Sequence, residues 1–321
     1  MVRSQRIAVA GGTGHIGLHV VEGLLSLKAT VPSLHVIILS RGVGPASITF
    51  AGFSAPIIAV DYSNALSIEN VLREHKVDTV ISALAGDADV FDVAQENLLS
   101  AALNVPTVYR FAPSELSVDS ETVDSVTLYV KKRPILKRLR DVKLTRSQAG
   151  VVFEFTKFVT GLAMNYLVSG NPKSNGVDAL GHMPPLGFVF DTAKGIAEIP
   201  GDGSALLWTT RIQEMGDFVA HVTQLDVWPE QVELVGDIRS LNEVKELLEQ
   251  VLGRKLQTTY VSKEELRSRM NHAATSILEN ILYEGLLSFA NGEMKRGETY
   301  PELKDQIKPM GLEEFLRMWW T

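Results

Sequence analysis

The stretch IAVAGGTGHIG, residues 7–17, decides the fold of this chain. An apolar run leads into three regularly spaced glycines, and residues 15–27 then carry apolar side chains at helical spacing. Gly11 permits a tight turn off a strand, Gly14 lets the backbone approach a pyrophosphate, and Gly17 lets the following helix pack closely. The N–H groups that open that helix can bind phosphate oxygens. The stretch therefore predicts a strand–turn–helix unit that binds a dinucleotide.

Short apolar runs and longer amphipathic stretches continue to alternate as far as residue 111. Continuous β-branched runs separated by helices indicate a parallel sheet that is buried on both faces. This order predicts an α/β Rossmann fold with a doubly wound parallel sheet. Strands are expected at 7–10, 35–39, 56–60, 79–84, 107–111 and 151–159, and helices at 15–27, 67–75, 89–103 and 125–141.

The second half of the chain has a looser pattern and is rich in turns from about residue 170. We expect a dinucleotide-binding domain over residues 1–160 and a smaller, mixed α/β substrate-binding part over residues 161–321, with the chain crossing between them. Two helix starts are marked there, since Ser240 with Glu243 and Ser262 with Glu265 each fit a capping box.

The composition of the 321 residues is that of a globular protein, with 45% apolar and 21% charged residues. A formal net charge of −7 argues against nucleic-acid binding, which usually needs a basic surplus. No stretch approaches the length of a membrane-spanning helix, so we expect a soluble, cytoplasmic protein. The lack of cysteine excludes thiolate metal sites. No metal is expected, because the scattered His182, His221 and His272 include no pair at a metal-ligand spacing.

The end of the second predicted strand indicates which dinucleotide is bound. An NAD-binding protein typically places Asp or Glu there, to accept hydrogen bonds from the ribose 2′-hydroxyl. This chain has Ser40 and Arg41 instead, and a guanidinium pairs with a 2′-phosphate. The cofactor is therefore expected to be NADPH. The alternative is an exposed arginine at a strand end. Asp61, after the third strand, could accept from the adenine amine or could cap the next helix.

Small residues end the fourth predicted strand, where the cofactor would pass closely. The residues expected to bind the cofactor are Gly11, Gly12, Thr13, Gly14, His15, Ile16, Gly17, Ser40, Arg41, Asp61, Ala83, Leu84, Ala85, Phe111, Lys132 and Thr160.

Taken together, these motifs resemble the NmrA-like and isoflavone-reductase-like branch of the atypical short-chain dehydrogenases. That branch includes phenylcoumaran benzylic ether and pinoresinol–lariciresinol reductases. The matching pieces lie along most of the chain: GGTGHIG (11–17), Arg41, VDTVISAL (77–84), YRFAPSEL (109–116), the basic helix with Lys132, FEFTKFVTGLAMNYL (153–167), AEIPGDG (197–203) and ELVGDIRSLNEV (233–244).

The resemblance implies a catalytic lysine near the nicotinamide, and Lys132 occupies that place, with Lys131 as the neighbouring alternative. A lysine buried there can have a lowered pKa and can act as a general acid or base. Tyr129 precedes Lys132 by three residues and can share its helix face. The alternative for Lys132 is a solvated helix face, since five other basic residues lie within 131–140.

Residues after the fifth and sixth strands are expected to line the substrate pocket: Pro113, Gly161, Leu162 and Met164. Two functions follow from the resemblance. The first is an NADPH-dependent reductase of a small, largely apolar and aromatic-type metabolite. The second is a non-catalytic dinucleotide-binding regulator of a partner protein, and the presence of Lys132 favours the first. A small-molecule substrate is the expected partner, and a homodimer is left open.

Overall fold

The parts of the chain that the structure describes, a computed structural model, are residues 3–42, 44–85, 88–173, 177–272, 277–295 and 297–321. The side chains of residues 88–90, 177 and 271–278, His272 among them, lie outside this description. Within the described parts, no helix combines the length and the apolar character that a membrane crossing requires.

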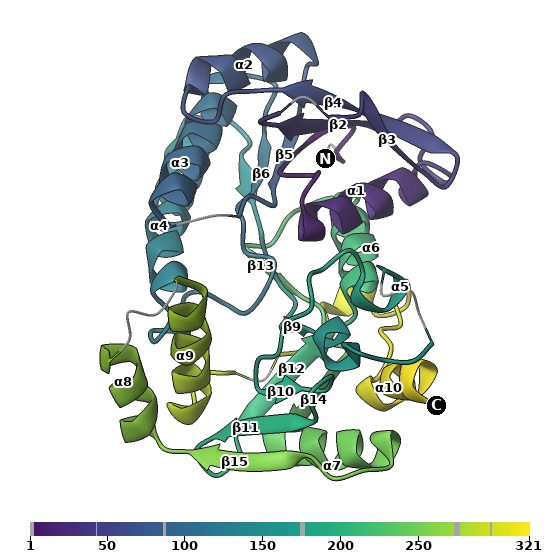
Figure 1. Ribbon diagram of the computed structural model, residues 1–321. Helices are drawn as coiled ribbons and strands as arrows, with labels where there is room; N and C mark the ends of the chain where they lie inside the picture. Colours follow the sequence, from purple (N-terminus) through teal and green to yellow (C-terminus); the bar gives the residue numbers. More distant parts are fainter. Residues whose placement is uncertain (1–2, 43, 86–87, 174–176, 273–276, 296) are drawn as a thin grey trace.

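A seven-stranded sheet with helices on both faces forms the upper half of the molecule in Figure 1. Its strands follow the order β3-β4-β2-β1-β5-β6-β7, and every neighbouring pair except β3–β4 is parallel. This is the doubly wound order that was expected. The elements are β1 (Arg6–Ala10), α1 (His15–Leu27), β2 (His35–Ser40), β3 (Ser47–Phe50), β4 (Phe53–Ala59), α2 (Ala65–Glu74), β5 (Thr79–Ser82), α3 (Ala88–Asn104), β6 (Arg110–Ala112), α4 (Thr127–Gln148) and β7 (Glu154–Phe155).

The strand order reverses at β1, which lies between β2 and β5. In open parallel sheets, ligands bind in the crevice outside the carboxyl ends of the strands at such a switch point. The turn after β1 carries the three glycines, so the fold itself places the candidate site.

Two local features differ from expectation. β3 forms an antiparallel hairpin with β4, and its tight turn uses Ala51 and Gly52, both with positive φ. The strand expected over 151–159 is divided into β7 and β8 (Lys157–Val159), and β8 pairs with β13 (Gln231–Glu233) instead of the large sheet. The strand divides where its hydrogen-bonding partner changes. Thr156 N–H donates to the carbonyl of Phe111 in the large sheet, and Lys157 N–H donates to the carbonyl of Glu230.

The lower half contains two three-stranded sheets and several helices (Figure 1). Leu241–Leu252 begins with the expected capping box, and at Ser262 the side chain accepts from Glu265 N–H at 3.1 Å. The remaining elements are β9 (Leu162–Ala163), η1 (Met164–Val168), α5 (Val177–Leu180), β10 (Phe190–Asp191), β11 (Ile196–Pro200), β12 (Leu206–Thr210), α6 (Ile212–Val222), β14 (Asp237–Ser240), α7 (Leu241–Leu252), β15 (Gln257–Val261), α8 (Lys263–His272), α9 (Ile277–Ala290), η2 (Pro301–Leu303) and α10 (Leu312–Trp320).

The chain returns to the first half through α6, which packs against α1. A Cβ built on Gly23 of α1 would lie 2.3 Å from the carbonyl oxygen of Gly216 on α6. A Cβ on Gly216 would lie 2.1 Å from the carbonyl oxygen of His19. The two helices therefore touch backbone to backbone, and residues from both halves share one core.

Candidate functional site

The turn between β1 and α1 is shaped by its glycines. Gly11 has φ 75°, and a Cβ there would lie 2.7 Å from the carbonyl oxygen of Ala83. A Cβ on Gly17 would lie 2.2 Å from the carbonyl oxygen of Gly11, which no side chain could tolerate. Gly14 is the N-cap of α1 and offers no side chain to the first amides of the helix. Because no side chain caps them, these amides are free to bind a ligand. The positive end of the helix dipole favours an anion there.

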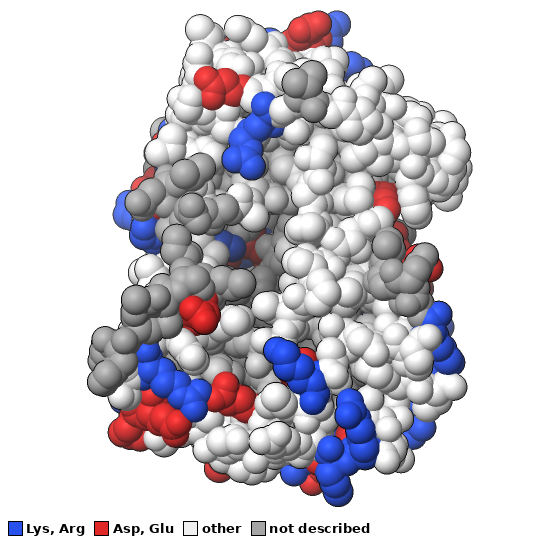
Figure 2. Space-filling view, in the orientation of Figure 1, with Lys and Arg blue, Asp and Glu red and all other residues white. Residues whose placement is uncertain are grey.

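A central cavity of about 370 Å³ lies beside this turn. Figure 2 shows that this face of the molecule is hollowed between the side of α3 and α4 and the side of α1 and α6. The structure thus brings together predicted residues from three distant segments of the chain. The lining residues are Gly14, His15, Ile16, Ala83, Leu84, Ala85, Phe91, Ser114, Leu116, Ser117, Leu128, Tyr129, Lys132, Tyr166, Met183 and Pro184.

A second, outer cavity of about 760 Å³ lies at the ends of β2 and β4, and Arg41 and Asp61 both line it. The Asp61 carboxylate accepts from Ser63 N–H at 2.9 Å and from Ser63 Oγ at 2.7 Å. Helix α2 is capped by Asn64, so Asp61 is not the N-cap residue. Thr13 Oγ1 and Ser40 Oγ lie 3.5 Å apart at the same edge.

Lys132 projects from α4 into the central cavity. Its Nζ lies 5.3 Å from the centre of the Tyr129 ring and 6.0 Å from that of the Phe91 ring. Burial lowers the pKa of Lys132, and the nearby Glu115 carboxyl opposes part of that shift. This environment differs from the solvated helix face that was the alternative for Lys132.

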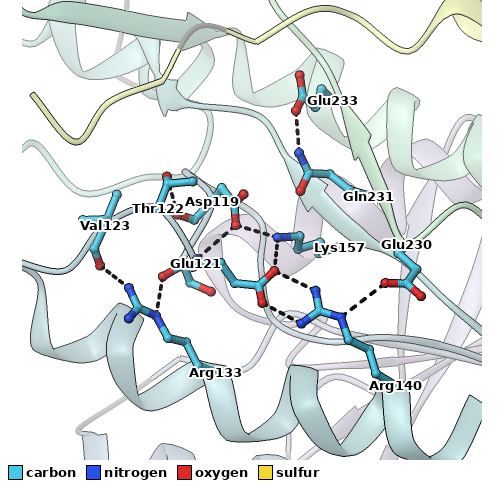
Figure 3. Close-up of polar contacts among 11 residues, drawn as sticks. Asp119, Glu121, Thr122, Val123, Arg133, Arg140, Lys157, Glu230, Gln231 and Glu233 are labelled. Atoms are coloured by element: carbon cyan, nitrogen blue, oxygen red, sulfur yellow. Dashed lines mark hydrogen bonds and ion pairs between the residues drawn. The ribbon is translucent and has the colours of Figure 1, made fainter.

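Two other basic side chains of α4, those of Arg133 and Arg140, make polar contacts with neighbouring segments (Figure 3). Arg133 donates to the carbonyl of Ser120 at 2.9 Å, and Arg140 donates to both carboxylate oxygens of Glu121. Glu121 and Asp119 in turn each lie 2.6 Å from Nζ of the buried Lys157. These hydrogen bonds and ion pairs hold α4 against the segment that follows β6. Lys132, in contrast, faces the cavity.

Glu115 interacts electrostatically with Lys132, although it does not line the central or the apolar cavity, and it was not among the predicted residues. It is 1% exposed, and its Oε2 has no hydrogen-bond partner within the described part of the chain. Burial raises the pKa of Glu115, while Lys132 acts in the opposite direction. The signal was available in YRFAPSEL, where a carboxyl follows the end of a predicted strand. What sequence could not show is that α4 places Lys132 beside it.

Tyr129 supplies a hydroxyl at the junction between the central cavity and an apolar one. Its hydroxyl lies 3.2 Å from Ser117 Oγ, and burial raises its pKa. Tyr166 lines both cavities, and burial raises its pKa to about 12. Both phenols are therefore neutral hydrogen-bonding groups at pH 7.

The apolar cavity has a volume of about 230 Å³ and shares Ile16, Leu116, Ser117, Tyr129, Tyr166 and Met183 with the central cavity. Three predicted residues, Thr160, Gly161 and Leu162, line it. Most of the remaining wall is aliphatic or aromatic: Val126, Leu186, Phe188, Ile212, Met215, Ile281, Leu282 and Met294.

Three predicted residues lie away from the cavity walls. Phe111 is fully buried in the core formed with α3 and α4, because alternate residues of β6 point to opposite faces of the sheet. Met164 is also fully buried, in the core of the lower half. Pro113 is buried, and the neighbouring Ser114 lines the cavity instead. These three side chains are buried in the packing of the protein and do not line the central or the apolar cavity.

The remaining predicted residues form the framework of the turn. Gly11 and Gly17 permit close approaches of the backbone, and Gly12 permits close packing of the side chains of Val9, Val21 and Ile38.

Comparison with known proteins agrees with this geometry. A model of the NmrA-like family matches residues 3–316. Oxidoreductase BOA1 of Botryotinia fuckeliana is 29% identical, over 93% of this chain and 95% of that protein. Leucoanthocyanidin reductase of Desmodium uncinatum is 27% identical, over 88% of this chain and 68% of that protein. The solved binary complex of leucoanthocyanidin reductase with NADPH from Vitis vinifera superposes with a TM-score of 0.68 at 21% identity, over 98% of each chain.

The doubly wound sheet, the glycine turn at its switch point and the adjoining cavities define a Rossmann-type protein with the fold of the NADPH-bound reductase. More particularly, the chain belongs to the NmrA-like family. The resemblance stated from the motifs is thereby confirmed, and the named relatives are oxidoreductases and reductases.

Proposed function

We propose that this protein is an NADPH-dependent reductase of a small, largely apolar metabolite of aromatic type, with Lys132 as the proton donor. One observation carries the proposal. The central cavity holds Lys132 together with the glycine turn and opens into a cavity with a mostly apolar wall. A proton donor, an anion-binding turn and an apolar pocket are the parts that such a reduction requires.

The residues present fit NADPH. The close approaches at Gly11 and Gly17 leave the first amides of α1 open to a diphosphate. The first turn of α1 contains no acidic residue that would repel it. Arg41, at the outer cavity, would pair with the 2′-phosphate. When bound, the nicotinamide supplies the hydride, and the protein supplies orientation and the proton.

Lys132 would hold the proton at Nζ. Burial disfavours the charged ammonium and so makes Nζ a better proton donor than an exposed lysine, while the Glu115 carboxyl acts in the opposite direction and favours the protonated form. The rings of Tyr129 and Phe91 flank Nζ and keep it pointed into the cavity. Tyr129 and Ser117 would offer hydrogen bonds to the single polar group of an otherwise apolar substrate.

The replacement Lys132→Met tests this function. We expect turnover with NADPH and a panel of aryl ethers, enones, quinones and carbonyl compounds to fall by about 10²–10⁴-fold, the usual contribution of a general acid. Binding of NADPH, measured by calorimetry, should be retained. The matched control is Lys137→Met on the same helix, where the side chain is exposed and pairs with Asp141. Normal turnover by Lys132→Met would remove the lysine from the mechanism.

The same panel separates the reductase from a non-catalytic regulator. If no compound is reduced while NADP binds tightly and a protein partner is recovered by affinity capture, the regulator becomes the better reading.

A further inference from the structure

We propose that His19, Glu22 and His182 form a binding site for a divalent transition-metal ion of the zinc type, on the side of α1 away from the sheet. This site is separate from the groups that the proposed reduction uses. Sequence spacing did not reveal it, because Glu22 and His182 are 160 residues apart.

The three side chains converge from two segments. His19 and Glu22 are three residues apart on α1 and so share a helix face. His182 follows α5 and approaches the same carboxylate. Nδ1 of His19 lies 2.9 Å from Oε2 of Glu22, and Nε2 of His182 lies 3.2 Å from Oε1. One ligand atom from each residue lies within 4.8 Å of the other two.

The hydrogen bonding of His19 leaves its Nδ1 without a proton in the neutral ring. Nε2 lies 2.6 Å from the carbonyl oxygen of Gly181, and a carbonyl only accepts, so Nε2 carries the hydrogen. The side chain is 3% exposed, and its Nδ1 faces Oε2 of Glu22 at 2.9 Å. A buried lone pair therefore faces a carboxylate at close range, and a cation between them would turn this contact from repulsive to attractive.

This arrangement is the one that metal-binding histidines adopt. A ligating imidazole usually donates its other N–H to a carbonyl or carboxylate, which fixes the tautomer and the ring orientation. Two imidazole nitrogens and one carboxylate, with an open fourth position for water, suit Zn²⁺. Bonds of about 2.0–2.2 Å in a tetrahedron require ligand atoms roughly 3.3 Å apart. The two nitrogen–carboxylate distances, 2.9 and 3.2 Å, are close to that value.

The backbone around His182 is already held in place. His182 has φ 59°, which is uncommon for a residue with a side chain, and Gly181 has the same value. His15 Nδ1 lies 2.5 Å from the carbonyl oxygen of His182, which gives a second attachment to α1. A Cβ on Gly181 would lie 2.4 Å from Cγ2 of Ile212, so the segment is closely packed.

The ion would stabilise one wall of the central cavity. Met183 and Pro184 follow His182 directly and line that cavity, as do His15 and Ile16 at the start of α1. A metal bridge between these two segments would hold the wall together without touching the reacting groups.

The test uses the full chain, freed of metal with a chelator, and titration with Zn²⁺ followed by calorimetry. We expect one ion per chain. Glu22→Gln and His182→Ala should each weaken binding by at least 10-fold, since the first removes the charge of the carboxylate ligand and the second removes an imidazole ligand. His35→Ala, an exposed histidine at the start of β2, is the matched control and should bind as the parent does. With Co²⁺ in place of Zn²⁺, visible absorption bands of a tetrahedral ion should appear in the parent and be lost in the two ligand variants.

Circular dichroism identifies any variant that fails to fold, and Glu22→Gln, the closer isostere, then carries the comparison. Absence of stoichiometric Zn²⁺ binding by the parent would overturn the proposal. So would equal affinity in the parent and a folded Glu22→Gln variant. In either case the cluster is an ion pair that depends on a protonated histidine.

Discussion

At the scale of single residues, Lys132 and Glu115 are coupled electrostatically beside the central cavity. Burial lowers the pKa of Lys132 and raises that of Glu115, and each opposes the shift of the other. Removing the Glu115 charge should lower the pKa of Lys132 further. We expect Glu115→Gln to move the alkaline limb of the kcat/KM profile to lower pH, because Lys132 loses its proton earlier.

The control for this profile is Asp124→Asn, an exposed carboxylate of the same segment that pairs with Arg133. An alkaline limb that stays in place in Glu115→Gln would show that Lys132 is not the titrating donor.

Arg41 makes a second prediction at this scale, on cofactor choice. Hydrogen bonds to a charged partner contribute about 1.5–3 kcal/mol, so Arg41→Ala should weaken NADPH about 10- to 100-fold. NADH, which has no 2′-phosphate, should bind nearly as before. The affinities of both nucleotides are measured by calorimetry, and an equal loss for the two would contradict the role of Arg41.

At the scale of elements, α1 and α6 pack backbone to backbone at Gly23 and Gly216. Gly23→Ala would place a Cβ 2.3 Å from the carbonyl oxygen of Gly216, so the helices must separate. Such overpacking typically costs about 1–3 kcal/mol. We expect that loss in the free energy of unfolding, measured in urea. Gly44→Ala is the control, since no atom lies within 4 Å of a Cβ built there, and its stability should stay within about 0.5 kcal/mol.

At the scale of the whole molecule, Arg110 joins the two halves. The side chain is fully buried on β6, and Nε lies 2.8 Å from Oε2 of Glu154. The guanidinium also donates to carbonyls beyond α6, at 3.1 Å to Thr223 and 2.9 Å to Leu225. Arg110→Met would leave a largely buried carboxylate and these carbonyls without their donor.

Breaking a buried ion pair in this way typically costs about 3–5 kcal/mol of unfolding free energy. We expect a loss of that size for Arg110→Met in urea denaturation. The double variant Arg110→Met/Glu154→Gln should recover part of it, because the uncompensated charge is then absent. Equal stability of the single and double variants would show that Glu154 contributes nothing to the cost.

The helices and strands of the first half could be predicted from the sequence, whereas only some of the residues that line the cavities could. The strand–turn–helix unit at 7–27 and the pocket positions Gly161 and Leu162 follow from local pattern. Phe111 and Met164 were expected at the pockets and lie in the cores, because the face of a short strand or turn that meets a cavity depends on which neighbours pack against it. Glu115 was missed for the same reason.

The order of residues along the chain alone determined the Rossmann fold and the glycine-rich turn after β1, because both depend on periodicity and on glycines only a few residues apart. Which distant groups meet was decided by tertiary packing. The position of α4 places Lys132 near Glu115. The packing of the segment after α5 against α1 places His182 beside His19 and Glu22. Such pairings depend on how helices and loops dock in space, and no local pattern encodes that docking.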